Sequence, residues 1–558
     1  VILTRLAAKR SAWNAADIRG EAERIIAELN IITEPTVRRE LAEDLTARAV
    51  EQGQPLIDPA QVPTHIRHLT SRHVLNVEAD LIARLSARGN QPADLVYSVP
   101  ADRHRNLDAG QRLAVEALVG TASLVVIEGA AGAGKTTTLA IANSYLGHHR
   151  MLIVAPTRNA AQVAEEHVGT VASSAAALAH AYGFRWDSDG AWSRVAVTQV
   201  DPTARLIPGD LLVVDEAAML DQDTAHALLT IADETGAGIA LIGDRHQLPA
   251  VGRGGLLDLA IAYANPRAHL SMDTVHRFTD PGYADLSLLM RSGHDPERVF
   301  DTLHAHGHIR LHPSDVEAVA ALAAASTGDD LVIADTGEQV ARINAAARTQ
   351  RRQTSGGHLH DRSPQQQAGK EGVITGAGEW IGVGDPVVTR RNDADLDVAN
   401  RQNWIVTAIL PDQSAVITGA RGERTLPPAY LREHVQLGYA ITAYGAQGHT
   451  VNDAHLLLSD ATTAAAAYVG MTRGRNSNTV HIVADTLEDA RTQWVATFSR
   501  DRADLGPTHA ARTALEDLDR YGPLRQPAEH SPQTGTGARR PPEPIPTRTP
   551  DRATGPSR

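Results

Sequence analysis

The sequence predicts an α/β fold with parallel sheets. Short β-branched apolar runs recur along it, and each is followed by a loop and then by a stretch whose apolar residues have helical spacing. These runs lie at 124–127, 151–154, 211–214 and 239–242, and again at 331–333, 455–458 and 479–483. Because the last three lie too far downstream to complete the first sheet, a second α/β domain is expected.

Length and composition support a multidomain globular protein. A chain of 558 residues exceeds what one hydrophobic core can organise, and it predicts roughly three or four domains. No uninterrupted apolar run reaches the length of about 18 residues that a membrane span needs, so no membrane insertion is expected. The absence of cysteine excludes disulfides, cysteine-ligated metals and thiol catalysis, and it fits a cytoplasmic location.

Composition shifts divide the chain. Helical spacing over 11–29 and 70–88 predicts a helical accessory region at the N-terminus. Short alternating strands among Gly and Pro predict a small β insertion within the second domain, and the Pro-rich end cannot support a core, so a disordered tail is expected. We therefore expect an accessory region at 1–100, a first domain at 101–270, a second at 271–354 and 437–490, the insertion at 355–436, and a helical end with the tail at 491–558.

We expect no targeting signal at the start of the chain. It begins at Val1 rather than Met, and no basic segment leads into an apolar one, so we expect a fragment without a signal peptide.

One glycine-rich segment matches the phosphate-binding P-loop pattern, and it lies between a predicted strand and a predicted helix. Glycines let the backbone wrap around phosphate oxygens, Lys135 reaches the terminal phosphates, and the Thr136 hydroxyl ligates Mg²⁺. The predicted ligand is a nucleoside triphosphate. The expected binding residues are Gly129, Ala130, Ala131, Gly132, Ala133, Gly134, Lys135, Thr136 and Thr137.

Two later strand ends supply polar side chains for the same site. The run at 211–214 ends in Asp215 and Glu216, so Asp215 is expected beside Mg²⁺ and Glu216 beside the attacking water. The run at 239–242 leads into a polar loop in which Gln247 is placed to hydrogen-bond a terminal phosphate. Alone, each could be an ordinary strand-end loop, and their order makes the pattern specific.

In this order the motifs resemble superfamily 1 helicases of the RecD-like branch over roughly residues 105–485. The resemblance implies two RecA-like P-loop motor domains that hydrolyse ATP. It places Gln111 of Leu107–Arg112 at the adenine, and Arg277 of Val275–Phe278 at the γ-phosphate. In Tyr468–Arg475 it makes Arg473 the arginine finger, whereas Arg475 is not expected to reach the same phosphate.

The resemblance also implies a 5′-to-3′ helicase on single-stranded DNA, with a small β-barrel in the second motor domain. Segments 155–158 and 439–450 match strand-contacting motifs, and an arginine pair lies in the insertion. The net charge of −13 opposes a positively coated surface but allows a narrow basic channel. The expected DNA contacts are Pro156, Thr157, Arg158, Arg390, Arg391, His449 and Thr450.

Upstream segments at 13–18 and 69–78 resemble the region that follows the nuclease in conjugative relaxases of the TraA and TrwC type. This resemblance implies that the chain is the helicase half of such a relaxase, and that it works with an upstream relaxase domain and the conjugation machinery. A RecD-like repair helicase would share every motor motif. A DNA-binding scaffold with a degenerate motor is the third alternative, and the intact Lys135, Glu216, Gln247 and Arg473 argue against it.

Three alternating histidines, His304, His306 and His308, could suggest a metal site. No acid cluster or candidate catalytic tyrosine accompanies them and the preceding segment reads as helix, so a surface histidine cluster is favoured.

Overall fold

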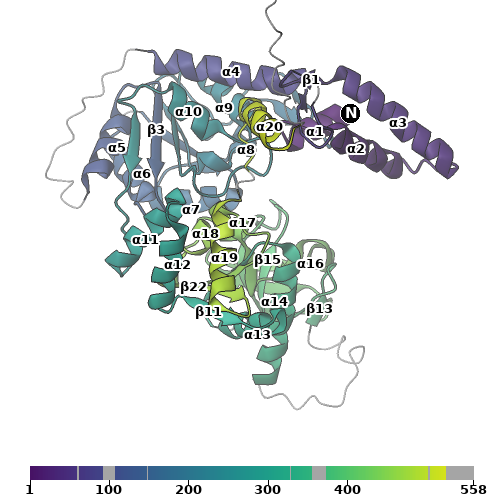
Figure 1. Ribbon diagram of the computed structural model, residues 1–558. Helices are drawn as coiled ribbons and strands as arrows, with labels where there is room; N and C mark the ends of the chain where they lie inside the picture. Colours follow the sequence, from purple (N-terminus) through teal and green to yellow (C-terminus); the bar gives the residue numbers. More distant parts are fainter. Residues whose placement is uncertain are drawn as a thin grey trace, which may run out of the picture.

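The computed structural model describes residues 1–58, 62–91, 107–147, 149–326, 328–354, 372–500 and 503–522. Two α/β bodies lie one above the other, and the helices of the N-terminal region extend along the upper one (Figure 1). We expected the disordered tail to begin after about Gly506, but residues 507–521 form a helix, and residues 523–558 lie outside the described residues. No described helix combines the length and the apolar character that crossing a membrane requires.

The upper body contains a six-stranded sheet in which every pair of neighbouring strands is parallel. Its strands, in spatial order, are β10 (His269–Met272), β3 (Leu124–Gly129), β9 (Gly238–Gly243), β8 (Leu211–Val214), β4 (Met151–Ala155) and β5 (Ala172–Ser174). The helices are α5 (Ala109–Val119), α6 (Lys135–Asn143), α7 (Arg158–Val168), α8 (Ala175–Ala181), η2 (Ala217–Met219), α9 (Gln222–Thr235) and α10 (Leu256–Tyr263). Because helices cover both faces, β3, β4 and β8 are buried along their whole lengths. The expected boundary at 270 falls inside β10, so the sheet extends past it.

The lower body contains a five-stranded parallel sheet. Its order is β11 (Ile309–His312), β22 (Gly474–Val483), β21 (Val451–Leu458), β12 (Leu331–Ala334) and β20 (Ala440–Thr442). Around it lie α11 (Pro281–Ser292), α12 (Pro296–Ala305), α13 (Asp315–Ala325), α14 (Gly337–Thr354), α17 (Ala443–Ala446), α18 (Ala464–Gly470) and α19 (Leu487–Phe498). The predicted α/β class with two parallel sheets is therefore confirmed.

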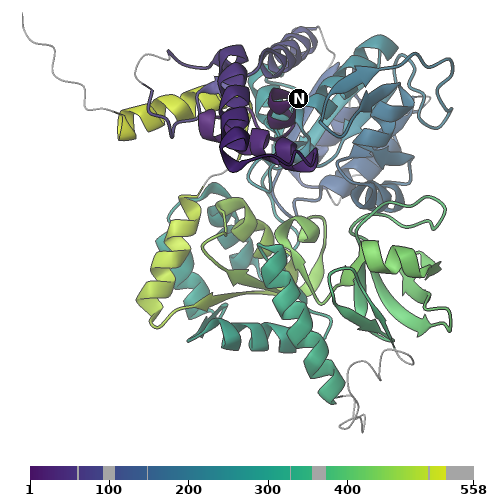
Figure 2. The ribbon, with the colours of Figure 1, turned by 90° about the vertical axis from the view of Figure 1, so that its right-hand side faces the viewer.

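The insertion lies beside the lower body (Figure 2). It holds the hairpin β13 (Gly372–Ile374) and β14 (Trp380–Gly382) and an antiparallel sheet in the order β18-β17-β16-β15-β19. That sheet comprises β15 (Pro386–Thr389), β16 (Asn403–Ile409), β17 (Ala415–Gly419), β18 (Gly422–Leu426) and β19 (Val435–Leu437), next to α16 (Pro428–His434). The edge strands β18 and β19 share no ladder in the described part of the chain, so the expected barrel is an open sheet here.

The N-terminal region is helical, as its apolar spacing predicts. It comprises α1 (Ile2–Lys9), α2 (Ala15–Glu28), α3 (Pro35–Gln52) and α4 (Arg72–Gly89), with the short pair β1 (Gln54–Pro55) and β2 (Leu69–Thr70). Asn14 and Asp17 form a capping box that begins α2. Helix α4 packs on the upper body: its Val77, Leu81 and Leu85 belong to that body's core.

The C-terminal end is shared between the two bodies, which the sequence did not predict. Helix α19 packs in the core of the lower body through Trp494. Helix α20 (Pro507–Tyr521) returns to α4, where Thr508 donates from its backbone N and hydroxyl to Glu78 at 3.1 and 2.8 Å. The hairpin β6 (Phe184–Trp186) and β7 (Trp192–Arg194) completes the described strands.

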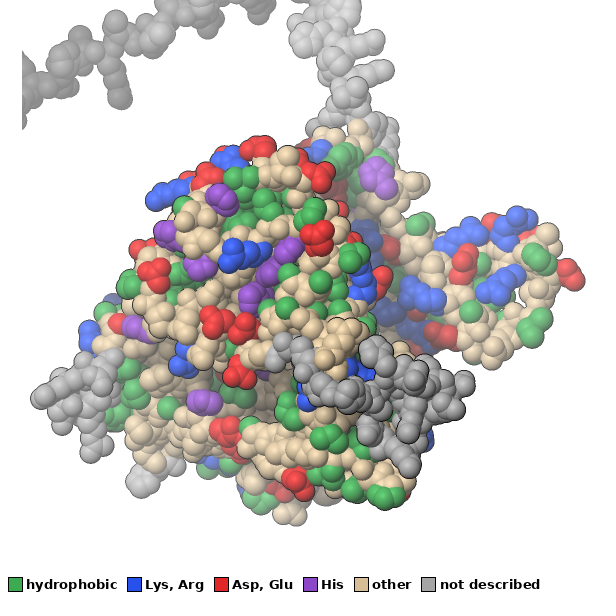
Figure 3. All heavy atoms as spheres, turned by 90° about the horizontal axis from the view of Figure 1, so that it is seen from below, with side chains coloured by type: hydrophobic (Ala, Val, Ile, Leu, Met, Phe, Trp, Pro, Cys, Tyr) green, Lys and Arg blue, Asp and Glu red, His purple; other side chains and the backbone are tan. Residues whose placement is uncertain are grey.

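Charge is distributed rather than concentrated on the face seen from below, where acidic, basic and histidine side chains intermingle (Figure 3). Of the three alternating histidines, His304 and His306 are exposed at the end of α12 and His308 is half-buried before β11. The His308 ring packs edge-on against Tyr283, with centroids 5.2 Å apart.

Candidate active site between the two bodies

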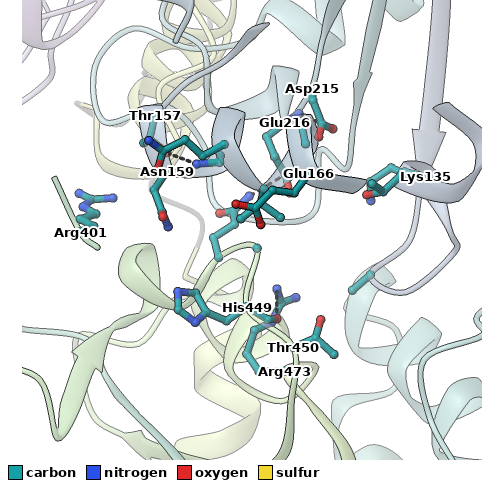
Figure 4. Close-up of a pocket in the computed structure, with 18 of the residues that line it drawn as sticks. Lys135, Thr157, Asn159, Glu166, Asp215, Glu216, Arg401, His449, Thr450 and Arg473 are labelled. Atoms are coloured by element: carbon teal, nitrogen blue, oxygen red, sulfur yellow. Dashed lines mark hydrogen bonds between the residues drawn. The ribbon is translucent and has the colours of Figure 1, made fainter. Parts of the chain in front are cut away.

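A cavity of about 680 Å³ opens where the two bodies and the insertion meet. Lys135, Asp215, Glu216 and Thr157 face it from the upper body, and His449, Thr450 and Arg473 face it from the lower body, with Arg401 to one side (Figure 4). Residues far apart in the chain thus share one cavity. It has two parts: one at the P-loop and one between α7 and the insertion.

The P-loop connects β3 to α6. Gly132 and Gly134 have φ of 84° and 80°, and a Cβ on Gly132 would lie 2.5 Å from Cβ of Arg277, so no other residue fits there. The Lys135 ammonium donates to the carbonyls of Gly129 and Ala130 at 2.8 and 3.3 Å. Both hydrogen-bond partners of the ammonium are neutral carbonyls, so its positive charge can still attract an anionic ligand.

The acidic pair follows β8. Burial, and then the neighbouring charge of Glu216, raise the pKa of Asp215 to about 6, and Lys135 opposes this shift. Glu216 has a φ of 53°, and its backbone N donates to Oδ1 of Asp215 at 3.0 Å. A cation arriving at this carboxylate would favour the charged form, so the donor set fits a hard divalent ion shared with Thr136.

Two arginines reach the cavity from the loop after β10 and from the end of α18. Arg473 is 2% exposed, and its guanidinium donates to the Val469 carbonyl at 2.9 Å and to the Thr472 hydroxyl at 3.0 Å. Nη1 of Arg277 donates to the Thr472 carbonyl at 2.6 Å. Among the described residues neither arginine forms an ion pair with a carboxylate, so two cations converge on one wall of the cavity, within reach of the charge of Glu216.

Burial dominates the pKa shifts of both arginines. Burial, followed by the charge of Arg473, lowers the pKa of Arg277 to about 9. Burial also lowers the pKa of Arg473, while the charge of Glu216 opposes this. A bound anion would oppose both pKa shifts, because a nearby negative charge stabilises a charged guanidinium.

Most of the expected nucleotide residues lie together. The residues that line the cavity are Ala131, Gly132, Ala133, Gly134, Lys135, Thr136, Thr137, Asp215, Glu216, Gln247, Arg277 and Arg473. Gly129 and Ala130 lie behind them in the loop. Gln111 does not line the cavity: it is 4% exposed, caps α5 through Asp108, and donates from Nε2 to the Ala133 carbonyl at 3.1 Å. Arg475, which we expected to point elsewhere, is exposed at the cavity too.

The expected DNA contacts separate into two groups. Pro156, Thr157, His449 and Thr450 line the cavity. Arg158, Arg390 and Arg391 do not line it, and the first and last contact other side chains instead: Nη2 of Arg158 lies 3.5 Å from Oδ1 of Asp397, and Nη1 of Arg391 lies 3.2 Å from Nε2 of His434.

Several cavity residues escaped the sequence prediction. They are Asn159, Glu166, Arg401, Trp404, Arg421, Tyr444 and Gln447. Gln447 lies in a motif segment that could have been searched further, whereas Arg401 occupies a loop position with a φ of 66° for which no spacing rule exists. The insertion contributes Arg401, Trp404 and Arg421, and its placement over α7 follows from tertiary packing alone.

Known proteins resemble this chain over much of its length. The family model of an AAA domain matches residues 106–314. A probable conjugal transfer protein TraA of Sinorhizobium fredii is 24% identical over 422 residues, which cover 73% of this chain and 35% of that protein. The chain thus spans about a third of the length of that relative.

Two further matches are to a RecBCD subunit and to a solved helicase structure. The RecBCD enzyme subunit RecD of Mycolicibacterium smegmatis is 27% identical over 409 residues, covering 68% of this chain and 70% of that subunit. A solved structure of Pif1 helicases at forked double-stranded DNA aligns with 17% identity and a TM-score of 0.47 over 69% of this chain and 93% of that one.

Proposed function

We propose that this chain, which belongs to the RecD-like helicases of superfamily 1, hydrolyses ATP in the cavity between its two bodies and uses that energy to move along single-stranded DNA. The proposal rests on one observation above all. Lys135 of the upper body and Arg473 of the lower body face the same cavity, so a bound triphosphate would touch both and couple its hydrolysis to their relative motion.

In this proposal each residue of the first part of the cavity has one role. The P-loop amides and Lys135 hold the phosphates, and Glu216 accepts a proton from the attacking water. Thr136 and Asp215 would hold Mg²⁺, which neutralises phosphate charge when it is bound. Gln247 hydrogen-bonds the terminal phosphate, and Arg277 and Arg473 stabilise the charge that grows on it in the transition state. Gln111 would have to leave its capping bonds to reach adenine.

The second part of the cavity, between α7 and the insertion, would hold the single-stranded DNA. Thr157 and His449 stand on opposite bodies, Arg401 supplies a cation from the insertion, and Tyr444 supplies an aromatic ring from α17. Burial, and then the charge of Arg390, lower the pKa of Arg401, and a bound phosphate would oppose this shift. A chain of phosphates and stacked bases satisfies this combination. We further propose movement in the 5′-to-3′ direction, which the RecD-like family resemblance supports.

The experiment that tests this function is strand displacement. A duplex with a 5′ single-stranded tail and one with a 3′ tail are each incubated with the protein, ATP and Mg²⁺. The 5′-tailed duplex should separate and the 3′-tailed one should remain. Separation of only the 3′-tailed duplex would reverse the polarity, and a lack of separation on both would contradict the function.

The biological setting that we propose is conjugative DNA transfer, with a relaxase and the transfer machinery as partners. The similarity to the TraA protein supports it. The second candidate is DNA repair, because the RecD subunit is slightly more similar over a similar share of this chain. Replacing the gene in a conjugative host with the Lys135→Ala form separates them: plasmid transfer should fall while survival after DNA damage stays at the parental level.

A further inference from the structure

A tyrosine that the proposed mechanism does not use joins the P-loop to the arginine finger. Tyr468 lies in α18 and is 1% exposed. Its hydroxyl accepts a hydrogen bond from the backbone N of Ala131 in the P-loop at 2.9 Å, and it donates to Oδ2 of Asp244 at 3.2 Å. One hydroxyl of the lower body thus contacts two loops of the upper body.

The surroundings fix the direction of both hydrogen bonds. Asp244 is buried and accepts from Nε of Arg291 at 3.0 Å and from Nε2 of Gln247 at 3.2 Å. A carboxylate held by these donors can only accept hydrogen bonds. The Tyr468 hydroxyl must therefore donate its hydrogen bond to Asp244 and accept the one from the backbone N of Ala131. Burial raises the pKa of Tyr468 well above its ordinary value, so the hydroxyl keeps this proton at neutral pH.

From Tyr468 the connection continues along the backbone to the two arginines. The Thr472 hydroxyl donates to the Tyr468 carbonyl at 2.7 Å, and the guanidinium of Arg473 is held by Val469 and Thr472. Any rotation of α18 therefore displaces Arg473. On the opposite side of the same loop, the backbone N of His276, the residue before Arg277, donates to the Gly132 carbonyl at 2.9 Å. The neighbouring P-loop residues Ala131 and Gly132 therefore contact Tyr468 and the segment that carries Arg277, respectively.

We propose that Tyr468 is a positioning residue that transmits the conformation of the P-loop to Arg473, an inference that rests on the proposed ATPase function. Phosphate binding shifts the loop amides, and a buried N–H cannot abandon its partner without a free-energy cost, so Ala131 and Tyr468 move together. Helix α18 then carries Arg473 to the γ-phosphate only when the loop is filled.

The test is a double-mutant cycle on ATP turnover with single-stranded DNA. Tyr468→Phe keeps the packed ring and removes the hydroxyl. It should lower kcat about tenfold, with the KM for ATP changed less than about threefold, because the loop still binds phosphate. In an Arg473→Ala background the same substitution should have no further effect, since Tyr468 acts through that arginine.

Tyr283→Phe is the matched control. Tyr283 is a buried tyrosine of the same core, and its hydroxyl donates to the Met471 carbonyl at 2.8 Å without contacting the P-loop. Its loss should lower kcat less than twofold and should add to the effect of Arg473→Ala.

Three outcomes would overturn the inference: additive effects of Tyr468→Phe and Arg473→Ala, an equal fall in Tyr283→Phe, or loss of ATP binding in Tyr468→Phe. The last would make the hydroxyl a support of the fold. A parent protein without ATP turnover would instead contradict the proposed function, and with it this inference.

Discussion

Nε2 of Gln447 donates to Oε2 of Glu216 over 3.1 Å, and this bond joins the loop after α17 to the acid that follows β8. The two residues belong to different bodies, and Gln447 precedes His449 and Thr450, which line the proposed strand site. Single-stranded DNA that moves this loop would therefore also move the Gln447 side chain, which orients Glu216.

Gln447→Glu should lower ATP turnover about tenfold or more relative to Gln447→Met, because a second carboxylate close to Glu216 repels it. The methionine variant loses the hydrogen bond without adding charge, so it isolates the repulsion. Steady-state ATPase assays of the two variants measure the difference, and equal turnover in Gln447→Glu and Gln447→Met would contradict this origin.

Glu216→Gln should bind ATP as tightly as the parent and hydrolyse it slower by orders of magnitude. The amide keeps the shape and the bond to Gln447 can re-form, but it cannot take a proton from water. Equilibrium binding of a fluorescent ATP analogue and single-turnover hydrolysis separate the two properties. Weakened binding with normal turnover of the bound fraction would show that Glu216 has a structural role instead.

His481→Gln should reduce the loss of thermal stability that acid produces. His481 is buried between His312 and His455, with ring nitrogens 2.9 and 3.0 Å apart, and burial followed by these neighbours lowers its pKa to about 3. The unfolded histidine takes up a proton near pH 6.5 and the folded one resists, so stability is full above that pH and falls below it.

Melting temperature between pH 7.5 and 5 measures this effect. His304→Gln, at an exposed histidine, should keep the parental slope. Because burial also lowers the pKa of His226, His246 and His449, the slope of His481→Gln should flatten without vanishing. An unchanged slope would mean that His481 titrates normally.

Glu166→Arg and Arg421→Glu should each shorten the residence time of single-stranded DNA a few-fold. Nε of Arg421 lies 2.9 Å from Oε1 of Glu166, so this ion pair closes the insertion against α7 beside the proposed strand site. Because both side chains are partly solvated, the pair contributes about 1 kcal/mol or less. The double reversal should restore the parental rate in stopped-flow dissociation; failure to restore it would mean that Arg421 binds phosphate directly.

The sequence best predicted those parts of the site whose residues lie close together in the chain. The P-loop and the strands that lead into Asp215 and Gln247 were predictable because short motifs with fixed spacing encode them. Contacts between distant residues were not: Arg158 pairs with Asp397, and α20 returns to α4 through Thr508 and Glu78, because tertiary packing decides these partners. Gln111 shows a third limit, since the family resemblance places it at adenine, whereas in the structure its side chain caps α5.

The measurement that tests the central claim most directly is ATP turnover of Arg473→Ala with saturating single-stranded DNA. The account holds that Lys135 binds the phosphates from one body and that Arg473 completes the site from the other. The variant should therefore bind ATP nearly as the parent does and lose on the order of a thousandfold in DNA-stimulated turnover. Parental turnover in Arg473→Ala would contradict an active site shared between the two bodies.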